Sequence, residues 1–145
     1  MEKKLIMIFD CFTYFNDDLI TDLRLNTLDK FVDKFIIVEA TTDHSGKKKE
    51  LCFDLKKFEK FKDKIRYIIV DDLPKNTKPF YYNKRMWHEN MVRDEYQRNQ
   101  ILRGLYDAKD DDLIVISDND EIPNLSNLKN INFRKYAVFN QKFYK

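Results

Sequence analysis

Glycine is scarce in this sequence, with only 2 among 145 residues against a usual share of roughly 7%. Glycine-rich loops bring the backbone close to phosphate groups, and this chain cannot build one. The sequence therefore excludes a P-loop and a dinucleotide-binding fingerprint. A phosphate group bound to this chain has to be held by side chains or by a metal ion.

Cysteine is equally scarce, with 2 residues, and the chain begins without a long apolar run. Cys11 and Cys52 cannot form a disulfide framework and lack the spacing of a zinc site, so we expect both to be small buried hydrophobic residues. The first apolar run, residues 5–9, is too short for a signal peptide or a membrane span, and we expect a cytoplasmic location. A net charge of +2 with 36% charged residues does not indicate nucleic-acid binding.

Hydrophobic residues are abundant: they make up 43% of the chain, which predicts a packed core and a single domain over residues 1–145. Apolar and alternating runs predict strands over residues 3–9, 35–38, 65–70, 113–116 and 133–144. Helical patterns lie between them, over residues 17–31 (with Asn16 as N-cap), 55–61 and 87–106. This alternation predicts an α/β fold with a mostly parallel sheet flanked by helices.

Acidic residues follow three of these strands. Asp10 and Glu39 close the first two, and Asp118 and Asp120 follow the strand at 113–116. Open α/β sheets bind ligands at the carboxyl ends of their strands. Crowded carboxylates repel one another unless a cation or protons neutralise them, and two carboxylates with water suit Mg²⁺ or Mn²⁺ beside a substrate phosphate. The sequence predicts a metal-diphosphate site here; the alternative is an acidic turn that caps a helix.

Six stretches form an ordered set along the chain. They are residues 9–16 (Phe-Asp-Cys-Phe-Thr-Tyr-Phe-Asn), 23–26 (Leu-Arg-Leu-Asn), 35–39 (Phe-Ile-Ile-Val-Glu), 45–47 (Ser-Gly-Lys), 96–99 (Tyr-Gln-Arg-Asn) and 116–123 (Ile-Ser-Asp-Asn-Asp-Glu-Ile-Pro). The acidic motif alone is weak, because Asp-x-Asp after an apolar run is common, but the ordered set is specific. Taken together, these stretches resemble glycosyltransferase family 17, the β-1,4-mannosyl-glycoprotein β-1,4-N-acetylglucosaminyltransferases and their microbial relatives.

The resemblance implies a GT-A-like fold, the Rossmann-like fold of nucleotide-diphospho-sugar transferases. It implies a UDP-sugar donor such as UDP-N-acetylglucosamine, a glycan hydroxyl as acceptor, and an inverting transfer assisted by Mn²⁺ or Mg²⁺. Asp120 is expected to bind the metal directly, and Asp118 to contact the ribose, the metal or its bound water. The family continues well beyond the acidic motif, so we expect the chain to be the donor-binding portion only, with the general base outside it.

The resemblance also suggests residues that contact the donor. Asp10 and Glu39 are expected near the nucleoside, although they equally suit helix capping. Phe12 or Phe15 suits stacking on the base or packing in the core. Arg93 and Arg98 are expected to bind the diphosphate, with a structural ion pair as the alternative for Arg98. Donor contacts are thus expected from Asp10, Phe12, Glu39, Arg93, Arg98 and Asp118, and metal contacts from Asp118 and Asp120.

Two other functions stay open. A non-catalytic protein that binds a nucleotide sugar fits a chain without an acceptor half, and predicts self-association or a partner subunit that supplies this half. A Mg²⁺-dependent phosphohydrolase of the haloacid dehalogenase type also places Asp-x-Asp after a buried strand. In that class the motif usually lies near the N-terminus, and Asp10 lacks the second acid. His44 and His88 lack the spacing of a metal site or a triad, so we assign neither a role.

Overall fold

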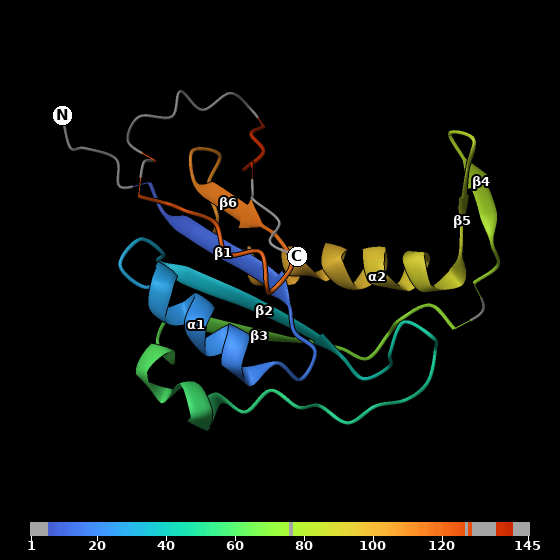
Figure 1. Cartoon of the computed structure of the whole chain (residues 1–145), viewed down its shortest axis with the longest axis horizontal. Helices are drawn as coiled ribbons and strands as arrows, with labels where there is room; N and C mark the ends of the chain where they lie inside the picture. Colours follow the sequence, from blue (N-terminus) through green and yellow to red (C-terminus); the bar gives the residue numbers. More distant parts are fainter. Residues whose placement is uncertain (1–5, 76, 127, 129–135, 141–145) are drawn as a thin grey trace.

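A four-stranded parallel sheet forms the centre of the protein (Figure 1). The computed structural model describes residues 6–75, 77–126, 128 and 136–140. In sheet order the strands are β3 (Ile65–Val70), β2 (Lys34–Ala40), β1 (Ile8–Thr13) and β6 (Leu113–Ile116). The predicted α/β class with a parallel sheet is confirmed, and β3 and β6 match the predicted runs residue for residue.

The strand order reverses between β1 and β6. From β1 the chain moves outward through β2 to β3, then returns to add β6 on the free side of β1. All four strands run parallel, so their carboxyl ends meet at one edge of the sheet. In open α/β sheets a ligand crevice forms outside the carboxyl ends where the order reverses. This topology directs attention to the segments that follow β1 and β6.

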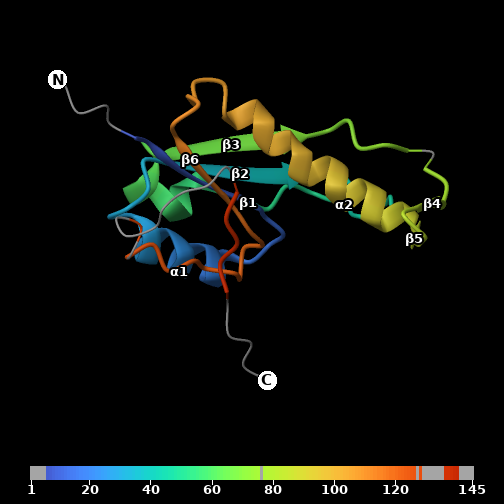
Figure 2. The same cartoon turned by 90° about the horizontal axis from the view of Figure 1, so that it is seen from above.

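Helices cover both faces of the sheet (Figure 2). One face carries α1 (Asp18–Leu28) and the 3₁₀ helix η1 (Leu55–Phe61), and the other carries α2 (Glu89–Asn99) and the 3₁₀ helix η2 (Gln100–Gly104). Alternate residues of β2 fill the two cores, with Phe35 facing α1 and Ile36 facing η2. Gly104 is a close-packing position, because a Cβ there would lie 2.5 Å from Ile36 Cγ2.

The two central strands differ from their predicted bounds. β1 begins at Ile8 and continues to Thr13, so Asp10 lies inside the strand and does not close it. Glu39 likewise lies inside β2, one residue before its end. Both carboxylates are fully buried. A charge inside a two-sided strand is tolerated only when it is paired and hydrogen-bonded, and the partners come from distant segments that the local pattern does not reveal.

The buried face of α1 is only partly as predicted. The apolar spacing within residues 17–31 predicts that Ile20, Leu23, Leu28 and Phe31 share it, and Leu28 is buried. Leu23, however, is 53% exposed, and the other buried residues of the helix are Thr21, Arg24 and Leu25. The N-cap is Asp17, which accepts from Ile20 N, and Asn16 instead adopts a positive φ of 48°. A charged residue, Arg24, is among those that face the sheet, so the helix is rotated relative to the orientation that its apolar residues predict.

A short antiparallel hairpin was not predicted. β4 (Phe80–Tyr82) and β5 (Arg85–Trp87) pair in the stretch before α2, and β5 ends at the residue where the helix over 87–106 was predicted to begin. Asn83 and Lys84 connect them with φ of 48° and 61°, the pattern of a type I′ turn. The helix predicted over 87–106 is divided into α2 and η2, and the part of the predicted strand 133–144 that is described, 136–140, is not a strand. Within the described residues, no helix is long and apolar enough to cross a membrane.

Candidate functional site

The segment after β6, residues 117–121, forms a compact turn that we call the acidic loop. Ser117 N donates to Cys11 O of β1 (3.3 Å), which places the loop directly at the point where the strand order reverses. Glu121 N donates to Asp118 O (3.0 Å), and Ser117 Oγ donates to Glu121 O (2.9 Å). These bonds close the turn, and the side chains of Asp118 and Asp120 remain exposed at the edge of the sheet.

Arg98 of α2 faces the acidic loop. Its Nη2 donates to Asp118 Oδ1 at 2.7 Å, and Asp94 lies 3.8 Å from the same nitrogen. Partial burial opposes the charge, but the bond to Asp118 raises the pKa of Arg98 above its ordinary value, so the guanidinium stays charged. The structural ion pair considered for Arg98 is therefore present. With its side chain 35% exposed, Arg98 also retains a surface for an incoming anion.

Asp120 provides the less engaged carboxylate of the loop. In the described part of the chain no residue donates a hydrogen bond to its side chain, and Asp118 uses one oxygen for Arg98. No group of three or more His, Cys, Asp or Glu side chains among these residues is placed to hold a metal ion. Two exposed carboxylates are hard oxygen donors that fit Mg²⁺ or Mn²⁺ when water and phosphate complete the shell. The donor chemistry thus fits a divalent cation, with the substrate supplying part of its coordination.

A pocket of about 310 Å³ lies at the carboxyl edge of the sheet, where β1 and β2 end. We call it the edge pocket. The ring of Phe15 is 68% exposed, and Lys49 Nζ lies 5.6 Å from its centroid. The pocket thus combines an accessible aromatic face with polar and charged groups. The lining residues are Thr13, Tyr14, Phe15, Thr42, Asp43, His44, Ser45, Lys49 and Gln97.

A tight turn over residues 43–47 forms one wall of the edge pocket. Gly46 has a φ of 91°, which an L side chain rarely adopts, and a Cβ there would lie 3.2 Å from the Arg93 guanidinium. Arg93 Nη1 donates to His44 O at 3.1 Å. His44 Nε2 donates to Gln97 Oε1 at 2.9 Å, because the Gln97 amide nitrogen faces Val38 O. α2 therefore fixes the shape of this wall.

Four of the predicted donor contacts lie in the interior. Both Asp10 oxygens accept from Arg24 at 2.8 Å, and the Phe12 ring is fully buried with the same guanidinium 4.6 Å from its centroid. Arg93 is 4% exposed, and it donates to Pro74 O at 3.1 Å as well as to His44. The fourth, Glu39, is fully buried. These contacts remove Asp10, Phe12, Glu39 and Arg93 from direct contact with a ligand, whereas Arg98, Asp118 and Asp120 lie accessible at the edge.

The buried carboxylate of Glu39 holds the segment 49–53 against β3. Its carboxylate accepts from Lys49 Nζ, Cys52 N, Phe53 N and Tyr67 Oη at distances of 2.5–3.0 Å. Burial alone would raise the pKa of Glu39, but the bonds from Lys49, Tyr67 and the two amides outweigh it and lower the pKa below the ordinary 4.5. Cys52, expected to be buried, is only half-buried beside this carboxylate.

Replacing Glu39 with Gln is expected to cost roughly 1–3 kcal/mol at neutral pH, because a neutral amide satisfies fewer buried donors. A carboxyl with a lowered folded pKa stabilises the protein above its ordinary pKa of 4.5 and loses this effect as the pH falls further. Urea unfolding should therefore show the gap between wild type and Glu39→Gln narrowing from pH 7 to pH 3. Glu59→Gln, at an exposed carboxylate, is the control. A gap independent of pH would contradict this role.

The sequence analysis missed three residues that shape the site. Arg24 contacts the acidic loop, Gln97 faces the edge pocket, and Lys49 connects Glu39 to Phe15. A signal existed for Arg24, since it lies in the matching stretch 23–26 and shares a helical face with Thr21, Leu25 and Leu28. An arginine on an otherwise apolar face indicates a buried acid or a set of carbonyl groups opposite it.

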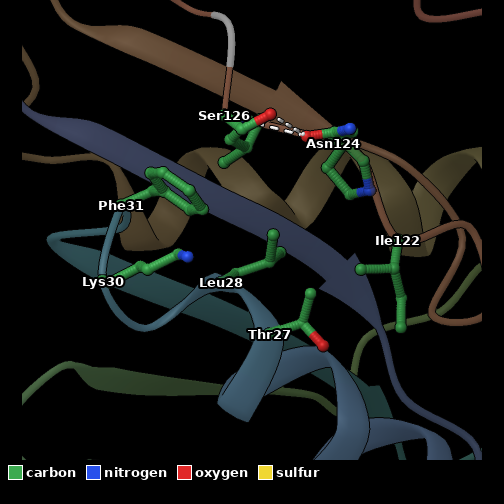
Figure 3. Close-up of a pocket in the computed structure, with 9 residues that line it drawn as sticks. Thr27, Leu28, Lys30, Phe31, Ile122, Asn124 and Ser126 are labelled. Atoms are coloured by element: carbon green, nitrogen blue, oxygen red, sulfur yellow. Dashed lines mark hydrogen bonds between the residues drawn. The ribbon is translucent and has the colours of Figure 1, made fainter.

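A second pocket, of about 340 Å³, lies away from this edge (Figure 3). Thr27 and Leu28 at the end of α1 line one side, and the segment 122–126 lines the other. Within that segment, Ser126 Oγ donates to Asn124 Oδ1 at 2.6 Å. α1 runs back from the carboxyl edge, so its end lies toward the opposite edge of the sheet. We therefore place the site at the acidic loop and the edge pocket.

Comparison with known proteins gives one match. A family model described as glycosyltransferase family 17 matches residues 1–136, which include both the acidic loop and the edge pocket. No curated protein and no solved structure gives a significant match. The match covers well over half of the chain and agrees with the resemblance carried by its motifs. The chain belongs to glycosyltransferase family 17.

Proposed function

We propose that this chain binds the donor of a GT-A-type, metal-dependent glycosyltransferase. The reaction is an inverting transfer of N-acetylglucosamine, or a related sugar, from a UDP-sugar to a glycan hydroxyl. One observation carries the proposal: Asp118 and Asp120 lie exposed where the strand order reverses, with Arg98 beside them. Family membership supports the class of reaction, and the sheet topology supports the position of the ligand.

The acidic loop is the proposed diphosphate site. Asp120, whose carboxylate is free of described donors, and Asp118 would hold Mn²⁺ or Mg²⁺. A cation bound there would neutralise the charge that develops on the leaving diphosphate. Arg98 lies 2.7 Å from Asp118 and would bind a phosphate oxygen from the side of α2. We assign no general base among the described residues.

The edge pocket is the proposed nucleoside site. Phe15 offers an exposed ring for stacking on the base, in place of the buried Phe12. Thr13 ends β1, and Ser117 N bonds to Cys11 O of the same strand, so the pocket and the acidic loop both lie at the carboxyl end of β1. A nucleoside in the pocket would therefore direct its diphosphate toward Asp118 and Asp120.

Calorimetric titration of UDP-N-acetylglucosamine with and without Mn²⁺ tests the proposal. We expect binding with Mn²⁺, and weakening of at least about tenfold when EDTA removes the metal, because carboxylates hold the diphosphate only through the cation. Phe15→Ala should weaken binding by roughly 1–3 kcal/mol if the ring stacks on the base. A well-folded protein that does not bind the donor, or binds it equally without metal, would contradict the proposal.

The structure disfavours Asp10 as the nucleophile of a phosphohydrolase. An aspartate nucleophile has to reach its substrate, whereas Asp10 is fully buried and both its oxygens bond to Arg24. The non-catalytic alternative predicts the same donor binding without transfer. Release of UDP in the presence of a glycan acceptor separates a transferase from a protein that only binds the sugar nucleotide.

A further inference from the structure

Arg24 is a fully buried arginine that connects three separate segments. It belongs to α1, and its Nε and Nη2 donate to the Asp10 carboxylate of β1 at 2.8 Å. Nη2 also donates to the Ser117 hydroxyl of the acidic loop at 2.7 Å. Nη1 donates to backbone carbonyl groups of the same loop. The acceptors in the loop are Ser117 Oγ and the carbonyl oxygens of Asp118 (2.7 Å), Asn119 (3.1 Å) and Glu121 (3.3 Å).

These contacts determine which way the acidic loop faces. The carbonyl groups of Asp118, Asn119 and Glu121 all point inward to one nitrogen, Arg24 Nη1. The carboxylates of Asp118 and Asp120 are exposed on the outer side. The only other side-chain bond from α1 to the loop among the described residues is Asn119 Nδ2 to Thr21 Oγ1, at 2.9 Å. Without Arg24, three carbonyl groups would lose their shared donor.

The chemistry of this position requires arginine. A guanidinium carries five donors in a planar fork, so it can pair with a carboxylate on one side and with carbonyl groups on the other. Lysine would supply a charge for Asp10 but only three donors on one atom. The Arg24→Lys variant therefore separates two roles of Arg24. It keeps a positive charge beside the Asp10 carboxylate and loses most of the contacts to the acidic loop.

We propose that Arg24 is a positioning residue for the metal-diphosphate site. It holds the backbone of the acidic loop so that Asp118 and Asp120 face the cation together, although it touches neither the metal nor the donor. This inference rests on the proposed function for its effect on binding. Its effect on the loop itself can be measured in the protein without metal or nucleotide.

The test compares Arg24→Lys with wild type in hydrogen exchange and in calorimetry with UDP and Mn²⁺. We expect amides of residues 117–121 to exchange about tenfold faster in Arg24→Lys, and the affinity for UDP with Mn²⁺ to fall about tenfold, because charge-assisted bonds to the loop are lost. Arg66→Lys is the matched control. Arg66 bonds to Gly104 O and the Asp107 carboxylate, away from the acidic loop, and its replacement should change neither measurement.

A double variant covers the case in which Arg24→Lys does not fold. Asp10→Leu with Arg24→Met removes both buried charges and should give the same faster exchange of the loop in a folded protein. Exchange of residues 117–121 at the wild-type rate in the folded variants would overturn the inference, as would unchanged affinity for UDP with Mn²⁺. If wild type itself does not bind UDP with Mn²⁺, the proposed function fails, and the exchange rates alone then decide the role of Arg24.

Discussion

Replacing Asp120 with Asn is expected to weaken metal-dependent donor binding by at least about 100-fold, since the loss of residues that merely support a metal ligand already costs about 10–100-fold. Asn keeps the size of the side chain and one oxygen but loses the negative charge that attracts the cation. Asp120 should have the larger effect of the two acids, because Asp118 divides its charge between the cation and Arg98. Calorimetry with UDP-N-acetylglucosamine and Mn²⁺ measures the change.

Asp110→Asn is the matched control for Asp120→Asn. Asp110 is an exposed carboxylate in the turn before β6, at the opposite end of the strand from the acidic loop. Its replacement removes the same charge from the surface and should leave binding unchanged. Equal weakening in the two variants would mean that general electrostatics drives binding, and wild-type affinity in Asp120→Asn would place the metal elsewhere.

Breaking the Asp10–Arg24 pair is expected to have the largest effect on stability. Arg24 Nη2 lies 2.8 Å from Asp10 Oδ1, and both side chains are 0% exposed to solvent. Removing one partner leaves an uncompensated buried charge, so Asp10→Leu or Arg24→Met should each lower the free energy of unfolding by about 3–5 kcal/mol. The total free energy of unfolding of a small domain is about 5–15 kcal/mol.

The double variant distinguishes charge pairing from packing. Asp10→Leu with Arg24→Met removes both charges and fills similar volume, so it should cost clearly less than the sum of the two single variants. Urea unfolding of the four proteins gives the coupling energy directly. Additive costs would show that the two residues act independently, in conflict with the bonds between them.

Two strands could be predicted from the sequence because their apolar, β-branched composition is a local property. Ile65–Val70 and Leu113–Ile116 are runs rich in β-branched residues, and they form β3 and β6 with the predicted bounds. Asp10 and Glu39 interrupted such runs and were therefore predicted to end them. Each is instead retained inside a central strand by partners 10–28 positions away in the chain, such as Arg24 and Tyr67. Such partners are set by tertiary packing, and the residues on either side of each acid do not identify them.

The candidate site was predictable only in part, for the same reason. The acidic loop follows a recognisable strand, and the structure places Asp118 and Asp120 exposed at the carboxyl edge. Arg93 and Arg98 are five residues apart on α2, and both were predicted to bind the diphosphate, with a structural ion pair as the alternative for Arg98. In the structure Arg93 is 4% exposed and bonds to His44 in the 43–47 turn, whereas Arg98 bonds to Asp118. The rotation of α2 on the sheet decides between them.

Paramagnetic broadening by Mn²⁺ tests the central claim most directly. Amide spectra of the protein with UDP, recorded with Mn²⁺ and with diamagnetic Mg²⁺, locate the bound cation. The account predicts that broadening is strongest at residues 117–121, extends to Arg98 and to the turn at 43–47, and disappears in Asp120→Asn. Broadening centred on the acidic turn at 110–112, or equal in wild type and Asp120→Asn, would contradict the account.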